Sequence, residues 1–219
     1  MNPIAPTSRT TFVRRPDRGS HERTTVNGIL DEALICHVGF VMDGQPFVLP
    51  TTHTRVGERL YVHGAMGGRM LRTMRQGIPV CVTVTLIDGL VLARSAFHHS
   101  MNYRSVVILG TARNVEDEEE KRLAFSALVE HVVPGRSADV RAASDLELKA
   151  TAVLCVPIEE ASAKVRTGPP IDDETDYGLP HWAGVIPLAL TAHAAIADPR
   201  LPAGLPIPPA IARYGRSGG

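Results

Sequence analysis

Residues 98–105 hold the densest group of side chains in this chain that could contact a small molecule. The group combines two imidazoles, an amide, a phenol and a guanidinium, from His98, His99, Asn102, Tyr103 and Arg104. Such side chains are poor material for an apolar core, but they offer hydrogen bonds and positive charge to a ligand. An apolar run follows at 106–109, so we expect the group to border a small-molecule slot where the chain enters a strand.

The adjacent histidines do not by themselves predict a metal site. Successive side chains of a strand point to opposite faces, so His98 and His99 are badly placed to bind one ion together. A metal would need further imidazoles from His37, His53 or His63, and neither HExxH nor CxxC occurs. We therefore predict no metal site, and haem, which needs only one axial histidine, stays open as an alternative.

The segment HGAMGGRM, residues 63–70, is the best candidate for binding an anion. Small residues ahead of a predicted helix let backbone N–H groups approach a phosphate, and a helix N-terminus favours negative charge. Arg69 adds a permanent cation. The pattern favours a phosphate site, although the motif GxxxxGK[ST] is absent and a flexible loop with a solvated arginine would look the same.

The tryptophan and the cysteines give weaker evidence about function than the segments above. Trp182 is the single tryptophan, and it either plugs the core or stacks on a planar ligand. The three cysteines lie inside apolar runs without CxxC spacing, which favours buried reduced thiols over a disulfide framework: Cys36, Cys81 and Cys155. No GxSxG elbow is present.

Charge and hydropathy exclude several classes of partner. Lys plus Arg and Asp plus Glu number 23 each, so the formal net charge is zero and gives no general attraction to nucleic acid or to an anionic membrane. No apolar run approaches the ~20 residues of a membrane span, and the first residues lack the apolar centre of a secretory signal. We expect a cytoplasmic protein without nucleic-acid or membrane partners.

Short apolar runs separated by tight turns dominate residues 35–112, with turn signals at Asp43-Gly44 and Gly57-Glu58. Capping patterns predict helices after Asp117 and after Ser144, and 151–166 is expected to form one last strand. This order predicts a mainly β fold with peripheral helices (α+β), in the form of an antiparallel barrel.

Proline and glycine mark both ends of the predicted domain. Residues 1–19 are expected to form an N-terminal arm, residues 20–190 a single domain, and residues 191–219 a Pro-rich C-terminal tail. No internal repeat is present. The simplest organisation is therefore one domain with two extensions.

The ordered segments resemble a known family. The central one is DGQPFVLPTTHTRVGERLYVHGAMGGRMLRTMRQGIPVCVTVTLIDGLVLARSAFHHSMNYRSVVILGTA, and AKVRTGPPIDD and WAGVIPL match a C-terminal signature. Over residues 12–190 they are similar to the flavin-nucleotide-binding proteins of the pyridoxamine-phosphate-oxidase-like superfamily, which includes the nitroimidazole-resistance proteins. The resemblance implies an FMN-binding antiparallel split β-barrel that works as a homodimer, with the flavins at the subunit interface.

The resemblance also implies cofactor contacts at individual positions. Four would line the flavin ring: Val48, Leu49, Pro50 and Thr51. Five would form the phosphate-binding turn: His63, Gly64, Gly68, Arg69 and Met70. The remaining positions would lie beside the phosphate and ribityl chain, near the flavin, or against the partner's flavin: Thr83, Thr85, Arg104, Ser105 and Trp182.

One departure from the family bears on activity. The family's oxidases carry arginines after the C-terminal tryptophan, whereas Trp182 is followed by Ala-Gly-Val-Ile-Pro-Leu. True pyridoxamine-phosphate oxidase activity is therefore not expected.

Our hypothesis is a small FMN-dependent reductase with an unknown small-molecule substrate. Its slot would be lined by His98, His99, Asn102 and Tyr103, and no catalytic acid or base is assigned. The alternatives are a flavin carrier or sensor without turnover, and a barrel that binds haem or a deazaflavin.

Overall fold

A computed structural model describes residues 2–215, apart from the side chain of Arg69. The body is built on three consecutive antiparallel strands: β2 (Ile35–Met42), β3 (Gln45–Val56) and β4 (Arg59–Ala65). Asp43 and Gly44 join β2 to β3 with positive φ angles of 52° and 76°, the conformation that tight hairpin turns with Asn or Asp before Gly adopt. The predicted turn is confirmed.

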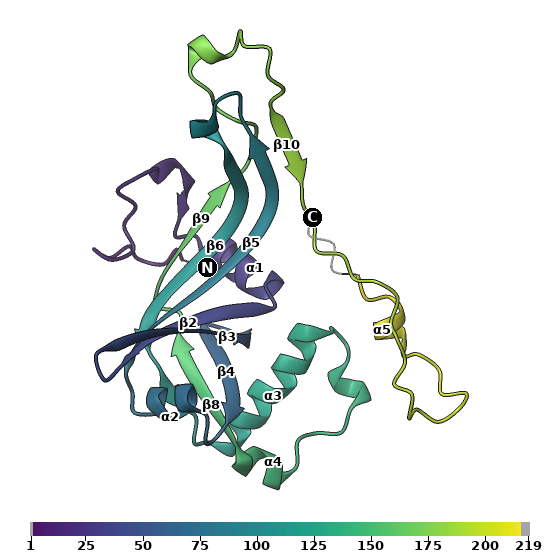
Figure 1. Ribbon diagram of the computed structural model, residues 1–219. Coiled ribbons are helices and arrows are strands. Elements are labelled where there is room, and N and C mark those ends of the chain that lie inside the picture. Colours follow the sequence, from purple (N-terminus) through teal and green to yellow (C-terminus); the bar gives the residue numbers. More distant parts are fainter. Residues whose placement is uncertain (1, 216–219) are drawn as a thin grey trace.

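The other strands extend this sheet on both sides. They are β1 (Gly19–Ser20), β5 (Pro79–Leu92), β6 (Ser100–Thr111), β7 (Arg113–Asn114), β8 (Thr151–Pro157), β9 (Glu160–Arg166) and β10 (Gly184–Pro187). The order is β1-β9-β6-β5-β2-β3-β4-β8-β7, with β10 on β5, and all pairs are antiparallel. The sheet curls around one core without a ladder between its two ends (Figure 1), which is the predicted split barrel.

Residues 151–166 were expected to form one strand, and this is wrong. Pro157 ends β8, and a turn at 158–159 sends the chain back as β9. Ile158 is buried in that turn, and its N–H donates to the Glu58 carbonyl (2.9 Å). An apolar residue inside the turn thus hid the break in the sequence pattern.

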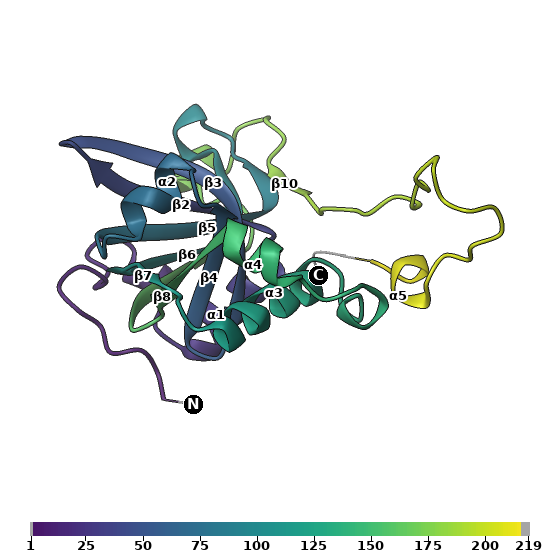
Figure 2. The ribbon, with the colours of Figure 1, turned by 90° about the horizontal axis from the view of Figure 1, so that it is seen from below.

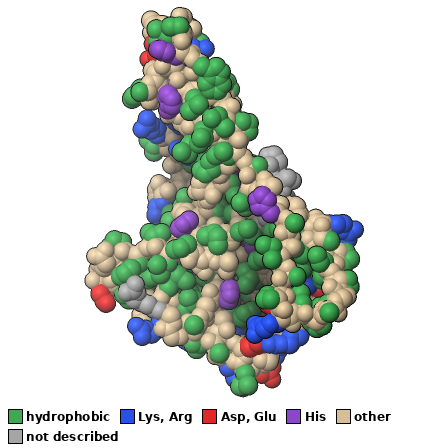
Figure 3. Space-filling view, turned by 45° about the vertical axis from the view of Figure 1, so that its right-hand side comes forward, with side chains coloured by type: hydrophobic (Ala, Val, Ile, Leu, Met, Phe, Trp, Pro, Cys, Tyr) green, Lys and Arg blue, Asp and Glu red, His purple; other side chains and the backbone are tan. Residues whose placement is uncertain are grey.

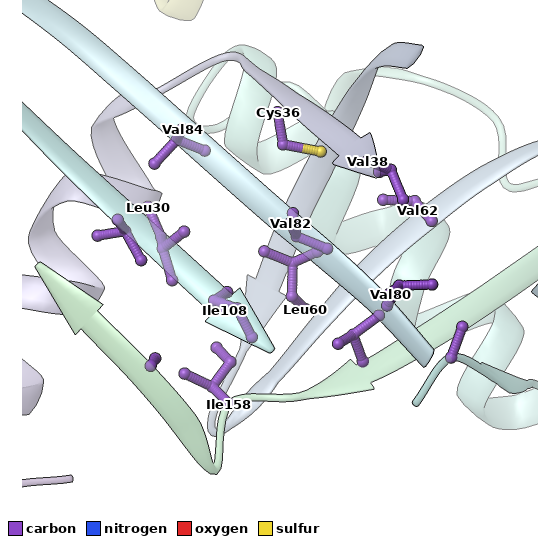
Figure 4. Packing of buried hydrophobic residues seen from close by; sticks show 14 of the residues in the cluster. Leu30, Cys36, Val38, Leu60, Val62, Val80, Val82, Val84, Ile108 and Ile158 are labelled. Carbon is purple, nitrogen blue, oxygen red and sulfur yellow. The ribbon is translucent and has the colours of Figure 1, made fainter. Parts of the chain in front are cut away.

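Alternate side chains of the strands fill the barrel (Figure 4). Val80, Val82 and Val84 of β5 all point inward and are buried. Helix α1 (Arg23–Glu32) adds Leu30 to the same cluster. Each fully buried aliphatic side chain contributes about 1.5–3 kcal/mol relative to exposure, so this inner set supplies most of the driving force for the fold.

The other helices lie outside the barrel. They are α2 (Arg69–Met74), α3 (Glu118–Val132), α4 (Asp145–Ala150) and α5 (Pro209–Ala212), with 3-10 turns η1 (Pro16–Arg18), η2 (Ala96–His98), η3 (Ser137–Asp139) and η4 (Glu174–Asp176). Both predicted N-caps are confirmed, since Asp117 accepts from the Glu120 N–H and Ser144 forms a full capping box with Glu147. No helix of the described residues is long and apolar enough to cross a membrane.

Strands β5 and β6 continue beyond the barrel as a projecting arm, on which β10 adds a third strand (Figure 1). After β10 the chain loops away from the body, and α5 lies again near the end of α3 (Figures 1 and 2). The first residues pack closely, because Ile4 is only 1% exposed and belongs to the core.

A charged cluster fixes α3 on the outer face of the barrel. The Glu120 carboxylate does not complete a second capping box but accepts hydrogen bonds from Tyr61 (2.7 Å) and from Arg113 (2.6 and 3.1 Å). Ala124 and Phe125 of the same helix pack against Tyr61 and Val153. The helix is therefore held by apolar contact and by charge-assisted bonds together.

We expect Glu120→Gln to lower the free energy of unfolding by about 1–2 kcal/mol at neutral pH, because charge-assisted bonds are lost. Hydrogen bonds from Arg113, opposed by burial and helped by Tyr61, hold the pKa of Glu120 below its usual value. The ionised group therefore stabilises the fold above the unfolded-state pKa of about 4.3, and this contribution is lost as the pH falls through the lower folded-state pKa. Urea unfolding across this pH range measures the difference.

Glu119→Gln is the matched control, because Glu119 is the exposed neighbour on the same helix. Its stability should stay within ~0.5 kcal/mol of the parent. Two outcomes would contradict the role given to the carboxylate. One is a Glu120→Gln variant as stable as the Glu119→Gln control at neutral pH. The other is a loss of unfolding free energy in Glu120→Gln that is as large at acid pH as at neutral pH.

Candidate functional site

The strand register decides which ring-lining side chains reach the outer face of the barrel. Val48 is 65% exposed and Pro50 is also exposed, whereas Leu49 packs against the core and Thr51 is half-buried. Side chains of a strand alternate between faces. Of the four predicted positions, only Val48 and Pro50 therefore fully present their side chains outside, and the others could contribute mainly backbone.

Three strands bring predicted residues together on this outer face. His37 of β2 pairs with Pro50 on one side and with Thr83 on the other, so these three side chains form a row. Thr85 pairs with Ser105 in the same orientation further along. His37 was not among the predicted site residues, because its place between Pro50 and Thr83 follows only from the pairing register.

The glycine turn after β4 is well formed, but its geometry is explained by packing. Gly68 precedes α2, and its N–H donates to the Ala65 carbonyl (2.9 Å). A Cβ on Gly68 would lie 3.1 Å from that carbonyl oxygen, and one on Gly64 would lie 3.2 Å from a Leu71 methyl. Helix α2 spans only six residues, so the helix-dipole part of the phosphate argument is weak.

For two other residues of this turn, Met70 and Arg69, the described structure shows no side chain on the outer surface. Met70 is buried in the barrel core, so any contact with a cofactor would come from its backbone. The side chain of Arg69, the predicted phosphate contact, lies outside the described part of the structure.

His63 points away from the barrel toward α3. Its ring meets the Phe125 ring edge-on, with 5.7 Å between centroids. The imidazole lines a cavity of about 740 Å³ between β4, α3 and the segment before α4. Burial lowers the pKa of His63 below its ordinary value, so the ring is neutral at neutral pH.

Arg104 is neutralised inside the chain. Its guanidinium donates to Asp88 (2.7 and 3.0 Å) and to Glu32 (2.8 Å), and these hydrogen bonds raise the pKa of Arg104. The group borders a second cavity of about 900 Å³ under the C-terminal segment, which also exposes carboxylates of Asp31 and Asp139. The described structure thus pairs this cation with protein carboxylates, and its predicted flavin contact stays a prediction.

Three of the four predicted slot residues contact other groups of the same chain through their side chains. Asn102 is 8% exposed, accepts from Arg166 and donates to the Gly168 carbonyl (3.1 Å). His98 lies 3.4 Å from Asp173, and the His99 ring contacts the Ser95 carbonyl (2.9 Å). Tyr103 is half-buried opposite Arg166. Most of the polar character of this segment therefore serves to tie the arm to the loop after β9.

Trp182 lies on the arm too. It is 69% exposed, and its ring rests so close to Gly184 that a Cβ there would approach within 2.8 Å. The indole does not plug the core, so it is free to contact a planar ligand or a second chain. Within the described residues, no group of three or more His, Cys, Asp or Glu side chains is placed to hold a metal ion.

Comparisons with solved structures reach almost the whole chain. The flavocytochrome Anf3 from Azotobacter vinelandii is 42% identical, with a TM-score of 0.89 over 95% of this chain and 97% of that one. An FAD- and haem-binding protein from Mycobacterium smegmatis is 35% identical, with a TM-score of 0.87 over 91% and 99%. A putative 5-nitroimidazole antibiotic resistance protein from Bacteroides thetaiotaomicron is 28% identical, with a TM-score of 0.55 over 67% and 86%.

A comparison with curated proteins found no match. The profile of the pyridoxamine 5'-phosphate oxidase family matches residues 22–165, which include the strands of the barrel from β2 to β8. Together with the split barrel and the extent of the structural matches, this shows that the chain belongs to the pyridoxamine 5'-phosphate oxidase family.

Proposed function

We propose that the protein is a redox protein that binds a flavin and a haem. The observation that carries this proposal is the likeness to flavocytochrome Anf3, which at 42% identity covers 95% of the chain and so reaches beyond the barrel. The relative from Mycobacterium smegmatis, which is named for FAD and haem, supports it independently. The nitroimidazole-resistance protein covers only 67% of the chain.

The outer face of β2, β3 and β5 fits a flavin. The row of Pro50, His37 and Thr83 offers an apolar surface, an imidazole and a hydroxyl, and Val48 extends the apolar part. A flavin would supply hydride and electron transfer, while the protein orients the ring and binds the phosphate. The family resemblance assigns the phosphate to the turn at 63–70, and the flavin could be FMN, as the resemblance implies, or FAD.

The flavin site requires a second copy of the chain. The flavin face is open in one chain and exposes three large aliphatic side chains, from Ile35, Val41 and Val48. The arm is also apolar at its surface (Figure 3), and Phe97 is 88% and Trp182 69% exposed. Exposed apolar patches of this kind mark interaction sites, and a homodimer would cover both.

A neutral imidazole is a common protein ligand of haem iron, and the macrocycle packs against apolar side chains while its carboxylates favour cations. The cavity beside α3 offers His63, two arginines and a wall of apolar side chains among otherwise polar lining residues, and its volume of about 740 Å³ suits a cofactor. The residues present therefore fit the group.

We expect the purified protein to be coloured. Denaturation should release a flavin that absorbs near ~450 nm, and mass spectrometry identifies it as FMN or FAD. A pyridine haemochromogen assay should give haem in comparable amount. Absence of both cofactors, even after reconstitution, would refute the proposal, whereas a flavin that neither NADH nor NADPH reduces without oxygen would favour a carrier or a protein reduced by another donor.

Arg69→Ala should weaken flavin binding by about 1.5–3 kcal/mol, the loss of a charge-assisted hydrogen bond to phosphate. Titration of the apoprotein with flavin, followed by fluorescence quenching, measures the affinity. Arg72→Ala, an exposed arginine one turn further along α2, is the control and should leave the affinity unchanged. Equal affinities for the two variants would remove Arg69 from the site.

Val48→Asp should shift the protein from dimer to monomer and reduce its flavin content, since a carboxylate in an apolar interface loses its hydration. Light scattering coupled to gel filtration measures the mass. Leu146→Asp places the same charge on an exposed leucine of α4, and it should remain dimeric. A Val48→Asp variant that stays dimeric with full flavin content would contradict the proposed interface.

A further inference from the structure

The cavity beside α3 holds one imidazole with an unusual environment. The ring of His63 makes no hydrogen bond with any described residue, and its contact is the edge-on Phe125 ring. A half-buried imidazole without a hydrogen-bond partner gives up the solvation of its nitrogens. The nitrogens of the His63 ring are therefore available to a ligand inside the cavity.

Other described histidines near the core or on the arm are already engaged. His53 lies 3.0 Å from the Leu30 carbonyl, His131 lies 2.8 Å from the Ala33 carbonyl, and His21 contacts the Thr10 carbonyl. Neither His37 nor His193 borders the cavity beside α3. Among the described residues that line this cavity, His63 is therefore the imidazole with free nitrogens.

One part of the cavity wall is apolar and suits a flat ring system. Phe125 and Val129 come from α3, and Val140, Ala142 and Ala143 come from the segment before α4. Small alanines leave room, and aromatic and aliphatic side chains exclude water from a bound macrocycle. Among the described residues that line the cavity, Glu147 is the one carboxylate, and it is paired with Arg141 (2.6 and 2.8 Å).

Two arginines line the cavity, each paired with carboxylates of the protein. They are Arg122 and Arg141. Arg122 forms ion pairs with Glu118 (2.8 Å) and Asp145 (2.5 Å), and both pairs lie near the surface. Exposed ion pairs are weak, so an anionic group of a ligand could exchange with them.

We infer that His63 is the axial ligand of the haem, with the macrocycle in the cavity beside α3 and its propionates toward Arg122 and Arg141. This inference rests on the proposed binding of haem. A neutral imidazole is the form that binds iron. This assignment separates His63 from the other predicted flavin contacts. The His63 ring lines the cavity, whereas Gly64 of the same turn packs against Leu71 of α2.

His63→Ala should lower the haem content by about tenfold or more, since loss of a metal ligand costs at least as much as loss of its supporting partners. Flavin content should remain that of the parent. Added imidazole should restore the Soret band, because the free ligand can occupy the vacated space. The control is His193→Ala, an exposed histidine of the C-terminal segment, which should keep its haem.

A second variant guards against misfolding. His63→Tyr keeps an aromatic ring against Phe125 and should convert the ferric haem spectrum to that of a phenolate-ligated iron, with an unchanged far-ultraviolet circular dichroism spectrum.

Full haem content with an unaltered spectrum in both His63 variants would overturn the assignment. So would loss of flavin with retention of haem, which would place His63 in the flavin site. A parent protein that takes up flavin but no haem would instead refute the haem part of the proposed function, and that failure is seen before any variant is made.

Discussion

The alternation of side chains along the barrel strands is the constraint on which the structure depends. Val80, Val82 and Val84 of β5 are buried together with Val38 of β2, and their burial determines the register of the strands. Once those residues face inward, Thr83 and His37 must face outward, and Pro50 joins them from β3. The candidate flavin face is thus a consequence of the same register that fills the core.

The cavity beside α3 has a different origin from the outer face of β2, β3 and β5. Contacts at Tyr61 and Glu120 hold the first turns of α3 against β4, and later residues of α3 line, with the segment before α4, a cavity over β4. His63 lines that cavity. The outer face of β2, β3 and β5 and the cavity beside α3 are thus two separate candidate sites on one barrel.

Two polar residues that were predicted to contact a ligand form hydrogen bonds within the chain instead. Asn102 and Arg104 were predicted to serve a slot or a flavin, yet Arg166, Glu32 and Asp88 satisfy them. A buried polar group costs about 1–3 kcal/mol if it is left without a partner, so the chain supplies partners from distant segments. No local pattern around residue 102 could reveal a partner 64 residues away.

The sequence by itself determined most of the barrel strands, the turn at Asp43-Gly44, both helix caps and the family, because these depend on local conformational preference and on ordered motifs, but it did not separate β8 from β9. It also placed Val48, Pro50 and Thr83 as candidates. Only the tertiary structure decided that Leu49 and Met70 face the core, that His37 completes the outer row, and that His63 turns toward a cavity. Those outcomes depend on which strands pair and on what covers each face, and these contacts join residues far apart in the chain.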